Sequence, residues 1–573
     1  MKNEPRQTEA SDMEPILSVR DLKVAFSRHK QVNEVLHGVN FDVYPGETVA
    51  IVGESGSGKS TTMHAVIDLL PGTGRVTDGS VMWRGRELVG SSRRDMETLR
   101  GREIGLVPQD PMSNLNPVWS IGFQVEEAIR ANGLAKSRKD VKARAIEVLQ
   151  QAGLKDAEKR MRQYPHQFSG GMKQRALIGI GLAANPQLLI ADEPTSALDV
   201  TVQRVVLDHL QSLASERGTA VVFITHDLGL AAERAEKLIV MYRGNVVESG
   251  PSREILQDPQ HPYTKRLVSA VPSLASRRLG SSPDLAPAPT ESFDVAALAE
   301  SELKDRKIGA PLVEVRDLTK VYKLRKGNFG HEDLTAVNRA SFTINRGETM
   351  ALVGESGSGK STIAKMVLQL EQPTSGSITI DGADTTRLGA KQLFDLRRKL
   401  QPVFQDPYGS LDPLRNIGNT IMEPLNVHKV GDSASRRDRV LELLDQVSLP
   451  RELASRYPNE LSGGQRQRVA VARGLALKPE ILVLDEAVSA LDVLVQAQVL
   501  ELLAELQRDL GLTYLFITHD LAVVRLIADR VCVMRSGEII EQATTDEVFE
   551  NPREEYTQNL LAAIPGASLH IGA

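Results

Sequence analysis

The residues of this chain that are best suited to chemistry lie in one eight-residue stretch, GESGSGKS, which occurs at residues 53–60 and again at residues 354–361. It fits the phosphate-binding pattern G-x-x-x-x-G-K-[S/T]. The glycines allow backbone N–H groups to curl around phosphate oxygens, the lysine reaches the outer phosphates, and the last serine offers a hydroxyl to Mg²⁺. A glycine-rich turn can match this pattern by chance, but two identical copies make that alternative poor. We therefore predict two nucleotide sites.

Each copy lies where a phosphate-binding loop has to lie, between a strand and a helix. Apolar residues 48–52 and 350–353 precede the two copies, and a helical pattern follows each of them. In this layout the positive N-terminal end of the helix points at the anion. The residues that we assign to phosphate binding are Gly53, Ser55, Gly56, Gly58, Lys59, Ser60 and Thr61 in the first copy, and Gly354, Ser356, Gly357, Gly359, Lys360, Ser361 and Thr362 in the second.

Two further apolar runs, at residues 188–191 and 481–484, are typical of strands buried on both faces, and each ends in an Asp-Glu pair. Ligands of α/β sheets bind beyond the carboxyl ends of the strands, so both pairs are expected at the nucleotide. One such pair alone could be no more than a charged strand end. We assign Asp192 and Asp485, with the hydroxyls of Ser60 and Ser361, to Mg²⁺, and Glu193 and Glu486 to polarising the attacking water.

The elements that must position these residues follow an α/β pattern written twice. Apolar strand patterns alternate with longer helical ones, which favours a parallel-rich sheet in each copy. The predicted domains are residues 15–273 and 311–567, with a flexible linker at 274–310 and tails at 1–14 and 568–573. The two phosphate loops are 301 residues apart, whereas the later matching motifs of the two copies are 293 residues apart. The first copy therefore has extra residues, which we expect in a surface loop such as 84–102.

Composition excludes several classes of function. The net charge of −5 gives no electrostatic reason to expect a nucleic-acid partner. Cys532 is the only cysteine, so neither a disulfide nor a thiolate metal cluster is expected. The N-terminus has no apolar signal-peptide core, and no run approaches 18 apolar residues. We expect a cytosolic protein that reaches a membrane only through a partner.

Between the loops and the carboxylate pairs, the chain resembles ATP-binding-cassette (ABC) ATPases at a specific motif, SGGM at 169–172 and SGGQ at 462–465. The rest of the family order is present in both copies. The resemblance assigns ATP-binding signature residues (Ser169, Gly170, Gly171, Ser462, Gly463, Gly464, Gln465), Q-loop glutamines that also serve the metal (Gln109, Gln405), D-loop aspartates (Asp199, Asp492) and catalytic switch histidines (His226, His519). Phe26 and Tyr322 would stack on adenine, although a core position fits an aromatic residue there equally well.

The resemblance implies two P-loop ABC ATPase domains in tandem. Each would have a parallel-rich core sheet, an antiparallel β subdomain and a helical signature subdomain. It also implies a head-to-tail pair, in which each ATP is bound by the loop of one domain and the signature of the other. ATP binding would close the pair and hydrolysis would reopen it. Met172, where the second copy has Gln465, removes an amide from one signature.

Two finer stretches resemble the oligopeptide/dipeptide importer ATPases. One follows the Q-loops, and the other contains His261-Pro262-Tyr263-Thr264 in the first copy and Glu555-Tyr556-Thr557 in the second. This resemblance implies two integral membrane permease subunits, an extracytoplasmic substrate-binding protein and a peripheral place on the cytoplasmic face of the cell membrane. Many relatives carry an iron–sulfur cysteine cluster after this element. The absence of those cysteines predicts none here.

Other functions remain as alternatives. Ribosome-associated tandem ABC factors usually bridge their domains with a long charged helix, whereas this linker is rich in Pro, Ser and Ala. ABC repair ATPases need zinc cysteines, and exporters commonly carry their own membrane helices. The cargo is left open between dipeptides, oligopeptides, glutathione and nickel complexes, since selectivity lies in the other subunits.

Overall fold

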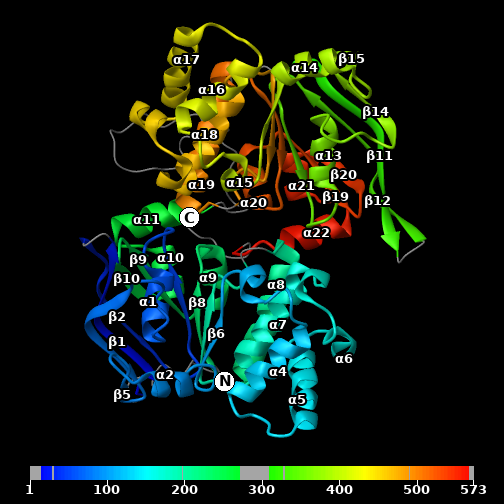
Figure 1. Cartoon of the computed structure of the whole chain (residues 1–573). Helices are drawn as coiled ribbons and strands as arrows, with labels where there is room; N and C mark the ends of the chain where they lie inside the picture. Colours follow the sequence, from blue (N-terminus) through cyan, green and yellow to red (C-terminus); the bar gives the residue numbers. More distant parts are fainter. Residues whose placement is uncertain are drawn as a thin grey trace, which may run out of the picture. The chain divides into compact units, whose positions relative to one another are not determined.

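The computed structural model describes residues 14–28, 31–195, 198–271, 309–326, 330–489 and 491–566. Its contacts divide the chain into two compact units, with the division after Val268, and both are α/β units (Figure 1). The predicted linker lies outside the described residues except for Gly309 and Ala310, and so do both predicted tails except for Glu14.

The first unit is built on a six-stranded sheet in the order β10-β9-β3-β8-β7-β6. All neighbours in this sheet run parallel except β10, which pairs antiparallel with β9 at the edge. The strands are β3 (Thr48–Val52), β6 (Ile104–Val107), β7 (Leu188–Asp192), β8 (Ala220–Ile224), β9 (Lys237–Tyr242) and β10 (Asn245–Pro251). The carboxyl ends of β3, β6, β7 and β8 therefore meet at one edge of the sheet.

A second, antiparallel sheet in this unit has the order β2-β1-β4-β5. Its strands are β1 (Leu17–Arg28), β2 (Gln31–Val43), β4 (Arg75–Trp83) and β5 (Arg86–Glu87). The helices are α1 (Lys59–Val66), α2 (Arg93–Leu99), α3 (Pro111–Asn114), α4 (Ile121–Ala131), α5 (Arg138–Gln151), α6 (Ala157–Arg160), α7 (Gly170–Leu182), α8 (Val200–Arg217), α9 (Leu228–Arg234), α10 (Ser252–Gln257) and α11 (Pro262–Ser269), with a 3₁₀ turn η1 (Pro165–Gln167).

Two apolar clusters hold the six-stranded sheet between two layers. Leu188 and Ile190 of β7 pack with α1 and the antiparallel sheet, whereas Leu189 and Ala191 pack with α4, α5, α7 and α8. Successive strand residues point to opposite faces, so a strand covered on both sides has to be apolar throughout. Figure 1 shows α4, α5 and α7 on the other side of the sheet from β1 and β2.

The second unit repeats this architecture. Its six-stranded sheet has the order β16-β17-β18-β13-β19-β20, with β13 (Thr349–Val353), β16 (Leu400–Val403), β17 (Ile481–Asp485), β18 (Thr513–Ile517), β19 (Arg530–Arg535) and β20 (Glu538–Thr544). The strands are parallel except for the edge strand β20. Its antiparallel sheet has the order β12-β11-β14-β15, with β11 (Pro311–Lys326), β12 (Gly330–Asn345), β14 (Ser375–Ile380) and β15 (Ala383–Asp384).

The helices of the second unit also match those of the first in order. They are α13 (Lys360–Val367), α14 (Ala390–Lys399), α15 (Pro407–Ser410), α16 (Ile417–Val427), α17 (Ser433–Gln446), α18 (Gly463–Leu475), α19 (Val493–Leu510), α20 (Leu521–Ile527), α21 (Thr545–Glu550) and α22 (Glu555–Ala562), with 3₁₀ turns η2 (Arg451–Ser455) and η3 (Pro458–Glu460). The predicted α/β class, with a core sheet, an antiparallel β subdomain and a helical subdomain in each copy, is confirmed.

The prediction for the extra residues of the first copy was mostly wrong. Gly79 and Gly376 are equivalent, because a Cβ on either would strike backbone carbonyl oxygens, those of Asp21 in the first unit and Asp317 in the second. The offset between these two glycines is 297, against 301 at the phosphate loops. About four of the eight extra residues therefore lie between the phosphate loop and Gly79, where loop length has little energetic cost. The offset is 296 at Gln109 and Gln405 and 293 at Ser169 and Ser462, so one further extra residue lies between Gly79 and Gln109 and three lie between Gln109 and Ser169.

Within the described part of the chain, no helix combines the length and the apolar content that crossing a membrane requires.

Candidate functional site

The phosphate loops join β3 to α1 and β13 to α13, as the sequence predicts. Gly53 has φ 147°, and a Cβ there would lie 2.1 Å from the carbonyl oxygen of Met241 in β9. Gly354 has φ 146° and meets the carbonyl of Met534 at 2.2 Å in the same way. Only glycine fits at either position. The first glycine therefore lets each loop pack closely against the neighbouring strand.

The loop lysines are buried and held by the first peptides of their own loops. Lys59 Nζ donates to the carbonyl oxygens of Gly53 (2.7 Å) and Glu54 (2.8 Å). Lys360 Nζ makes the equivalent bonds to Gly354 and Glu355 at the same distances. A buried ammonium is costly unless it is hydrogen-bonded. These carbonyl groups therefore hold the charge of each lysine in a fixed place at its loop.

The serines and aspartates assigned to Mg²⁺ lie next to each other in both units, whereas the Q-loop glutamines that were also assigned to the metal donate to the glutamates. Ser60 Oγ donates to Asp192 Oδ1 at 3.0 Å, and Ser361 Oγ donates to Asp485 Oδ1 at 3.2 Å. Burial raises the pKa of both aspartates above the ordinary value, although each serine hydroxyl acts in the opposite direction. A nearby dication favours the ionised form. Hydroxyl and carboxylate oxygens are ligands that Mg²⁺ prefers, so the residues present fit this ion.

The predicted catalytic glutamates are each held by the two other predicted active-site residues. Glu193 Oε2 accepts from Gln109 Nε2 at 2.6 Å, and Oε1 lies 3.1 Å from His226 Nδ1. In the second unit, Glu486 Oε2 accepts from Gln405 Nε2 at 2.6 Å. Its Oε1 lies 3.5 Å from His519 Nδ1. Three residues that are far apart in sequence meet because β6, β7 and β8, like β16, β17 and β18, end at the same edge of the sheet.

Each glutamate–histidine contact has the character of an ion pair. Burial alone would raise the pKa of Glu193, but the hydrogen bond and charge of His226 outweigh it and lower that pKa. Burial alone would lower the pKa of His226, and Glu193 raises it above its ordinary value. The pKa values of Glu486 and His519 shift in the same directions for the same reasons. The carboxylate is thus kept ionised, as a group that polarises water requires.

Both glutamates also have an unusual backbone conformation. Glu193 has φ 42° and Glu486 has φ 47°, in the left-handed region that side chains rarely adopt. Their N–H groups donate to the carbonyls of Ile224 and Ile517, each at 2.9 Å, which holds the strained peptide at the sheet edge. Strain of this kind clusters at functional sites. The sequence alone gives no signal for it.

The signatures begin helices. Ser169 is the N-cap of α7 and Ser462 is the N-cap of α18. A Cβ on Gly171 would lie 2.5 Å from the Val202 side chain of α8, and Gly464 has the same relation to Val495 of α19 at 2.3 Å. These glycines therefore allow two helices to approach closely, and the remaining signature glycines, Gly170 and Gly463, occupy the first helical position.

The two signatures differ at their fourth residue. In α18 the Gln465 side chain accepts from the Ser462 N–H at 3.0 Å, while Ser462 Oγ accepts from the Gln465 N–H at 3.3 Å. This is a reciprocal capping box. Met172 supplies only a backbone N–H, which donates to Ser169 Oγ at 3.4 Å. The first signature helix therefore lacks one of the two capping bonds.

The D-loop aspartates also cap helices. Asp199 Oδ1 accepts from the Val202 N–H at 3.1 Å at the start of α8, and Asp492 Oδ1 accepts from the Val495 N–H at 3.2 Å at the start of α19. Their D-loop neighbours Ser196, Ala197 and Ala490 lie outside the described residues. A further role of these aspartates at the nucleotide stays a prediction.

The aromatic residues assigned to adenine lie in the antiparallel sheets. Phe26 of β1 is half-buried against the core cluster, and its ring fills the space beside Gly74, where a Cβ would come within 2.7 Å. Tyr322 of β11 has the Lys320 ammonium 5.0 Å from its ring centroid. Both residues thus have contacts of their own, and their stacking on adenine stays a prediction.

One contact at the loops was missed by the sequence reasoning. The hydroxyl of Tyr263 in α11 accepts a hydrogen bond from the Glu54 N–H of the first phosphate loop at 2.9 Å. The hydroxyl of Tyr556 in α22 accepts one from the Glu355 N–H of the second loop at 3.2 Å. The signal was present, because both tyrosines belong to the stretch that marks the importer resemblance. Nothing in a linear sequence ties that stretch to a loop about 200 residues earlier.

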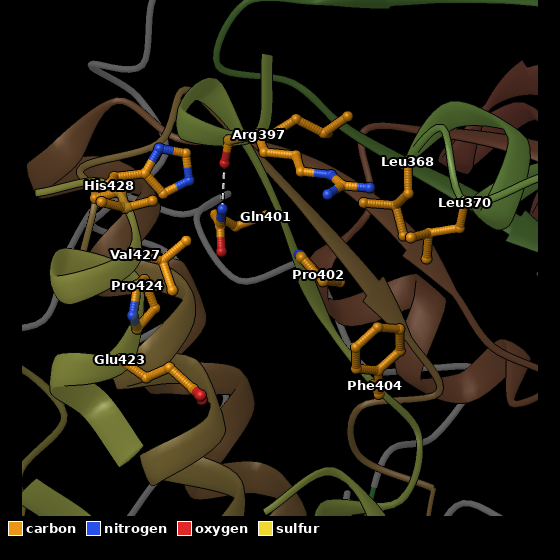
Figure 2. A pocket seen from close by; sticks show the side chains of 12 residues that line it. Leu368, Leu370, Arg397, Gln401, Pro402, Phe404, Glu423, Pro424, Val427 and His428 are labelled. Carbon is orange, nitrogen blue, oxygen red and sulfur yellow. Dashed lines mark hydrogen bonds between the residues drawn. The ribbon is translucent and has the colours of Figure 1, made fainter. Parts of the chain in front are cut away.

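A mostly apolar groove of about 270 Å³ opens beside the second Q-loop. Figure 2 shows Pro424, Val427 and His428 on one side and Pro402 and Phe404 on the other. Phe404 directly precedes Gln405, and Phe404 and Val427 are both exposed. Arg397 and Glu423 add charge to the lining. This groove is thus an accessible apolar surface beside Gln405, whose side chain contacts the predicted catalytic residue Glu486.

Comparison with known families gives two matches, each in both units. The ABC transporter family matches residues 36–196 and 337–489. The family described as "Oligopeptide/dipeptide transporter, C-terminal region" matches residues 247–294 and 540–570. The second family includes both tyrosines that contact the phosphate loops.

Several curated proteins are similar along nearly the whole chain. The glutathione import ATP-binding protein GsiA of Salmonella choleraesuis (strain SC-B67) is 44% identical over 97% of this chain and 90% of its own length. The protein of the same name from Escherichia coli (strain K12) is 43% identical over 96% of this chain and 90% of its length. Among solved structures, the dimeric ABC cassette MJ0796 bound to ADP and Pi is 33% identical over 41% of this chain and 99% of that chain, with a TM-score of 0.37.

The resemblance found in the sequence is thus confirmed by the family matches and by relatives that share the tandem arrangement along nearly their whole length. The chain belongs to the ABC transporter family, as an ATP-hydrolysing subunit of the oligopeptide/dipeptide importer type.

Proposed function

We propose that the chain drives solute import by hydrolysing ATP at both of its phosphate loops, with Glu193 and Glu486 polarising the attacking water. The observation that carries this proposal is the contact of each glutamate with a Q-loop glutamine and a histidine. These contacts orient the carboxylate, and the histidine keeps it ionised. Each unit has a complete set of these groups, so we expect both sites to turn over.

The other assigned residues bind and orient the nucleotide. Backbone N–H groups of the loops and the N-termini of α1 and α13 receive the phosphates, and Lys59 and Lys360 neutralise their charge. Ser60 with Asp192, and Ser361 with Asp485, would hold Mg²⁺. When bound, this ion stabilises the negative charge that develops during phosphoryl transfer.

Glu→Gln substitutions test this assignment. We expect Glu193→Gln and Glu486→Gln each to lower steady-state ATP hydrolysis by at least about 10²-fold at its own site, and the double variant to be inactive. The measurement is phosphate release by the chain assembled with its permeases. Glu97→Gln, an exposed glutamate of α2 paired with Arg93, is the control and should leave the rate unchanged. Full activity in either single variant would show that its site is idle.

We further propose that each ATP is completed by the signature of the other unit. The hydrogen bonds given for Ser169 and Ser462 are made to their own helices, α7 and α18. By this proposal, the signatures bind the nucleotide of the other unit and not that of their own. A serine hydroxyl and glycine N–H groups at a helix N-terminus suit a γ-phosphate. By this proposal, Lys59 and Glu193 work with the second signature, and Lys360 and Glu486 work with the first.

The partners follow from the importer type. We propose two permease subunits in the membrane, an extracytoplasmic substrate-binding protein, and a peripheral place for this chain at the cytoplasmic face. The names of the relatives favour glutathione or a similar small peptide as cargo. Uptake of labelled glutathione and labelled dipeptides by cells that express the complete importer would separate these cargoes.

A permease helix is the proposed occupant of the groove in the second unit. The apolar residues Val427, Pro402 and Phe404 would receive the apolar face of a short cytoplasmic helix, and Arg397 and Glu423 would pair with its polar residues. Phe404 directly precedes Gln405, and Gln405 donates a hydrogen bond to Glu486. A helix that docks on Phe404 would therefore shift the position of the Glu486 carboxylate. This links the membrane partner to the catalytic carboxylate.

A further inference from the structure

The C-terminal helices α11 and α22 touch the nucleotide sites through one tyrosine hydroxyl each. Tyr263 Oη accepts from the Glu54 N–H at 2.9 Å, and Tyr556 Oη accepts from the Glu355 N–H at 3.2 Å. We propose that these tyrosines are positioning residues, which hold the first peptides of the phosphate loops in the shape that binds nucleotide. The C-terminal region would then set the ATP affinity of each unit.

The peptide that each tyrosine holds is also the one that holds the loop lysine. The carbonyl oxygens of Gly53 and Glu54 accept from Lys59 Nζ at 2.7 and 2.8 Å. The Glu54 carbonyl also accepts from the Ser57 N–H at 3.1 Å, which closes the turn of the loop. The Glu54 N–H and the Gly53 carbonyl belong to one planar peptide, so fixing this N–H fixes the orientation of the Gly53 carbonyl that accepts from the ammonium. The same chain of contacts runs from Tyr556 through Glu355 to Lys360.

The two rings are held by different chemistry at the same place. Tyr263 is 1% exposed and stacks on Tyr242, with ring centroids 4.2 Å apart. At the equivalent position of β19, the second unit has Arg535, whose guanidinium lies 4.9 Å from the centroid of Tyr556. An aromatic ring and a planar cation both support a tyrosine face. The residue that packs on the tyrosine ring thus differs between the two units, whereas the hydrogen bond between the tyrosine hydroxyl and the loop is the same in both.

A carboxylate from the edge strand fixes the start of each helix. Glu248 of β10 accepts from the N–H groups of Gln260 and His261, at 2.9 and 3.1 Å. Glu541 of β20 accepts from the N–H groups of Arg553 and Glu554, at 2.9 and 3.3 Å. Negative charge at this end also suits the helix dipole. The tyrosine is thus anchored to the sheet independently of the loop, as a positioning residue requires.

Nucleotide binding by the full-length chain tests the proposal. Lys360→Ala removes the lysine of the second loop, so binding of a fluorescent ATP analogue with Mg²⁺ by that variant reports on the first loop. In this background we expect Tyr263→Phe to raise the Kd of the analogue about tenfold, because the Glu54 N–H loses the tyrosine hydroxyl as its acceptor while the ring stays in place. Tyr242→Phe is the matched control. It removes the hydroxyl of the stacked ring, which has no hydrogen bond to another described residue, and should change Kd less than about twofold.

The second unit gives an independent test, with Tyr556→Phe in a Lys59→Ala background and the same expected rise. Hydrogen exchange supplies a readout without nucleotide. Peptides that cover residues 53–58 should exchange faster in Tyr263→Phe than in the parent and in Tyr242→Phe. Unchanged Kd and unchanged exchange in both units would overturn the proposal, even if the thermal midpoint falls. A parent that binds no analogue would instead refute the assignment of the loop, and hydrogen exchange would still decide the role of the tyrosine.

Discussion

At the scale of single residues, the two glutamates that we propose as catalytic have a strained backbone and a restrained carboxylate. Each has a positive φ angle, and each carboxylate is hydrogen-bonded by a glutamine from one neighbouring strand end and paired with a histidine from the other. The preceding aspartate makes a different contact, because it accepts a hydrogen bond from the loop serine. Two adjacent carboxylates can therefore serve a metal and a water molecule separately.

The ion pair of Glu193 and His226 predicts a pH-dependent stability. The pKa of His226 lies above 6.5 in the folded chain, so its stabilising contribution is complete below that value and is lost as pH rises through the raised pKa. The pKa of Glu193 lies below 4.5, so its contribution is lost only as pH falls through the lowered value. The difference in thermal midpoint between the natural chain and Glu193→Gln should therefore be larger near pH 6 than near pH 9.

The control for this measurement is Glu97→Gln. Glu97 pairs with an arginine, and an arginine side chain does not deprotonate in proteins, so the small effect of that substitution should be the same at both pH values. An equal difference at both pH values for Glu193→Gln would contradict a charged histidine at this site.

Residue types and spacing were enough to predict the loops and the Asp-Glu pairs, because these motifs are short and local, and the resemblance to ABC ATPases added the glutamines and the histidines. They were not enough to predict how these groups meet. The positive φ of Glu193 depends on the Ile224 carbonyl of the next strand, and the Tyr263 contact depends on a helix that follows the last strand. Such contacts follow from tertiary packing, which sequence periodicity does not encode.

At the scale of elements, the α/β prediction succeeded because β7 and β17 are apolar on both faces. Only a strand covered by two layers has that pattern. The position of the extra residues was mispredicted, because surface loops tolerate insertions at little cost and leave no periodic signal. The groove beside α16 was also not foreseen, since its lining comes from α14, β16 and α16 and from the segments that follow α13, β16, α16 and α18.

The capping difference between the signature helices gives a prediction for α18. Gln465→Met removes the side chain that accepts from the Ser462 N–H, so we expect a loss of about 0.5–1 kcal/mol at this helix start. Hydrogen exchange in the first turn of α18 should speed up by a few-fold. The reciprocal substitution Met172→Gln should slow exchange at the start of α7. No change in either helix would show that the capping box contributes nothing.

A charge placed in the groove tests permease docking. Val427→Glu puts a carboxylate among Pro402, Phe404 and Pro424, so co-purification of the permeases should fall by at least about tenfold. Hydrolysis by the isolated chain should stay unchanged. Leu510→Glu, at the exposed end of α19, is the matched control and should keep the permeases bound. Equal recovery of the permeases with both variants would place the docking surface elsewhere.

At the scale of the whole molecule, one chain carries two complete sets of the residues that we propose for catalysis. The phosphate loops, glutamates, glutamines, histidines and tyrosine contacts recur in both units, and the signatures differ only in their fourth residue. We therefore expect two working ATP sites that hydrolyse ATP at unequal rates. The site that uses the first signature should be the slower, because Met172 lacks the amide that caps the other helix.

The most direct test of this account is a structure of the Glu193→Gln, Glu486→Gln chain trapped with Mg-ATP. The ATP on Lys59 should contact Ser462, and the ATP on Lys360 should contact Ser169. A trapped state in which each nucleotide touches residues of a single unit would contradict it.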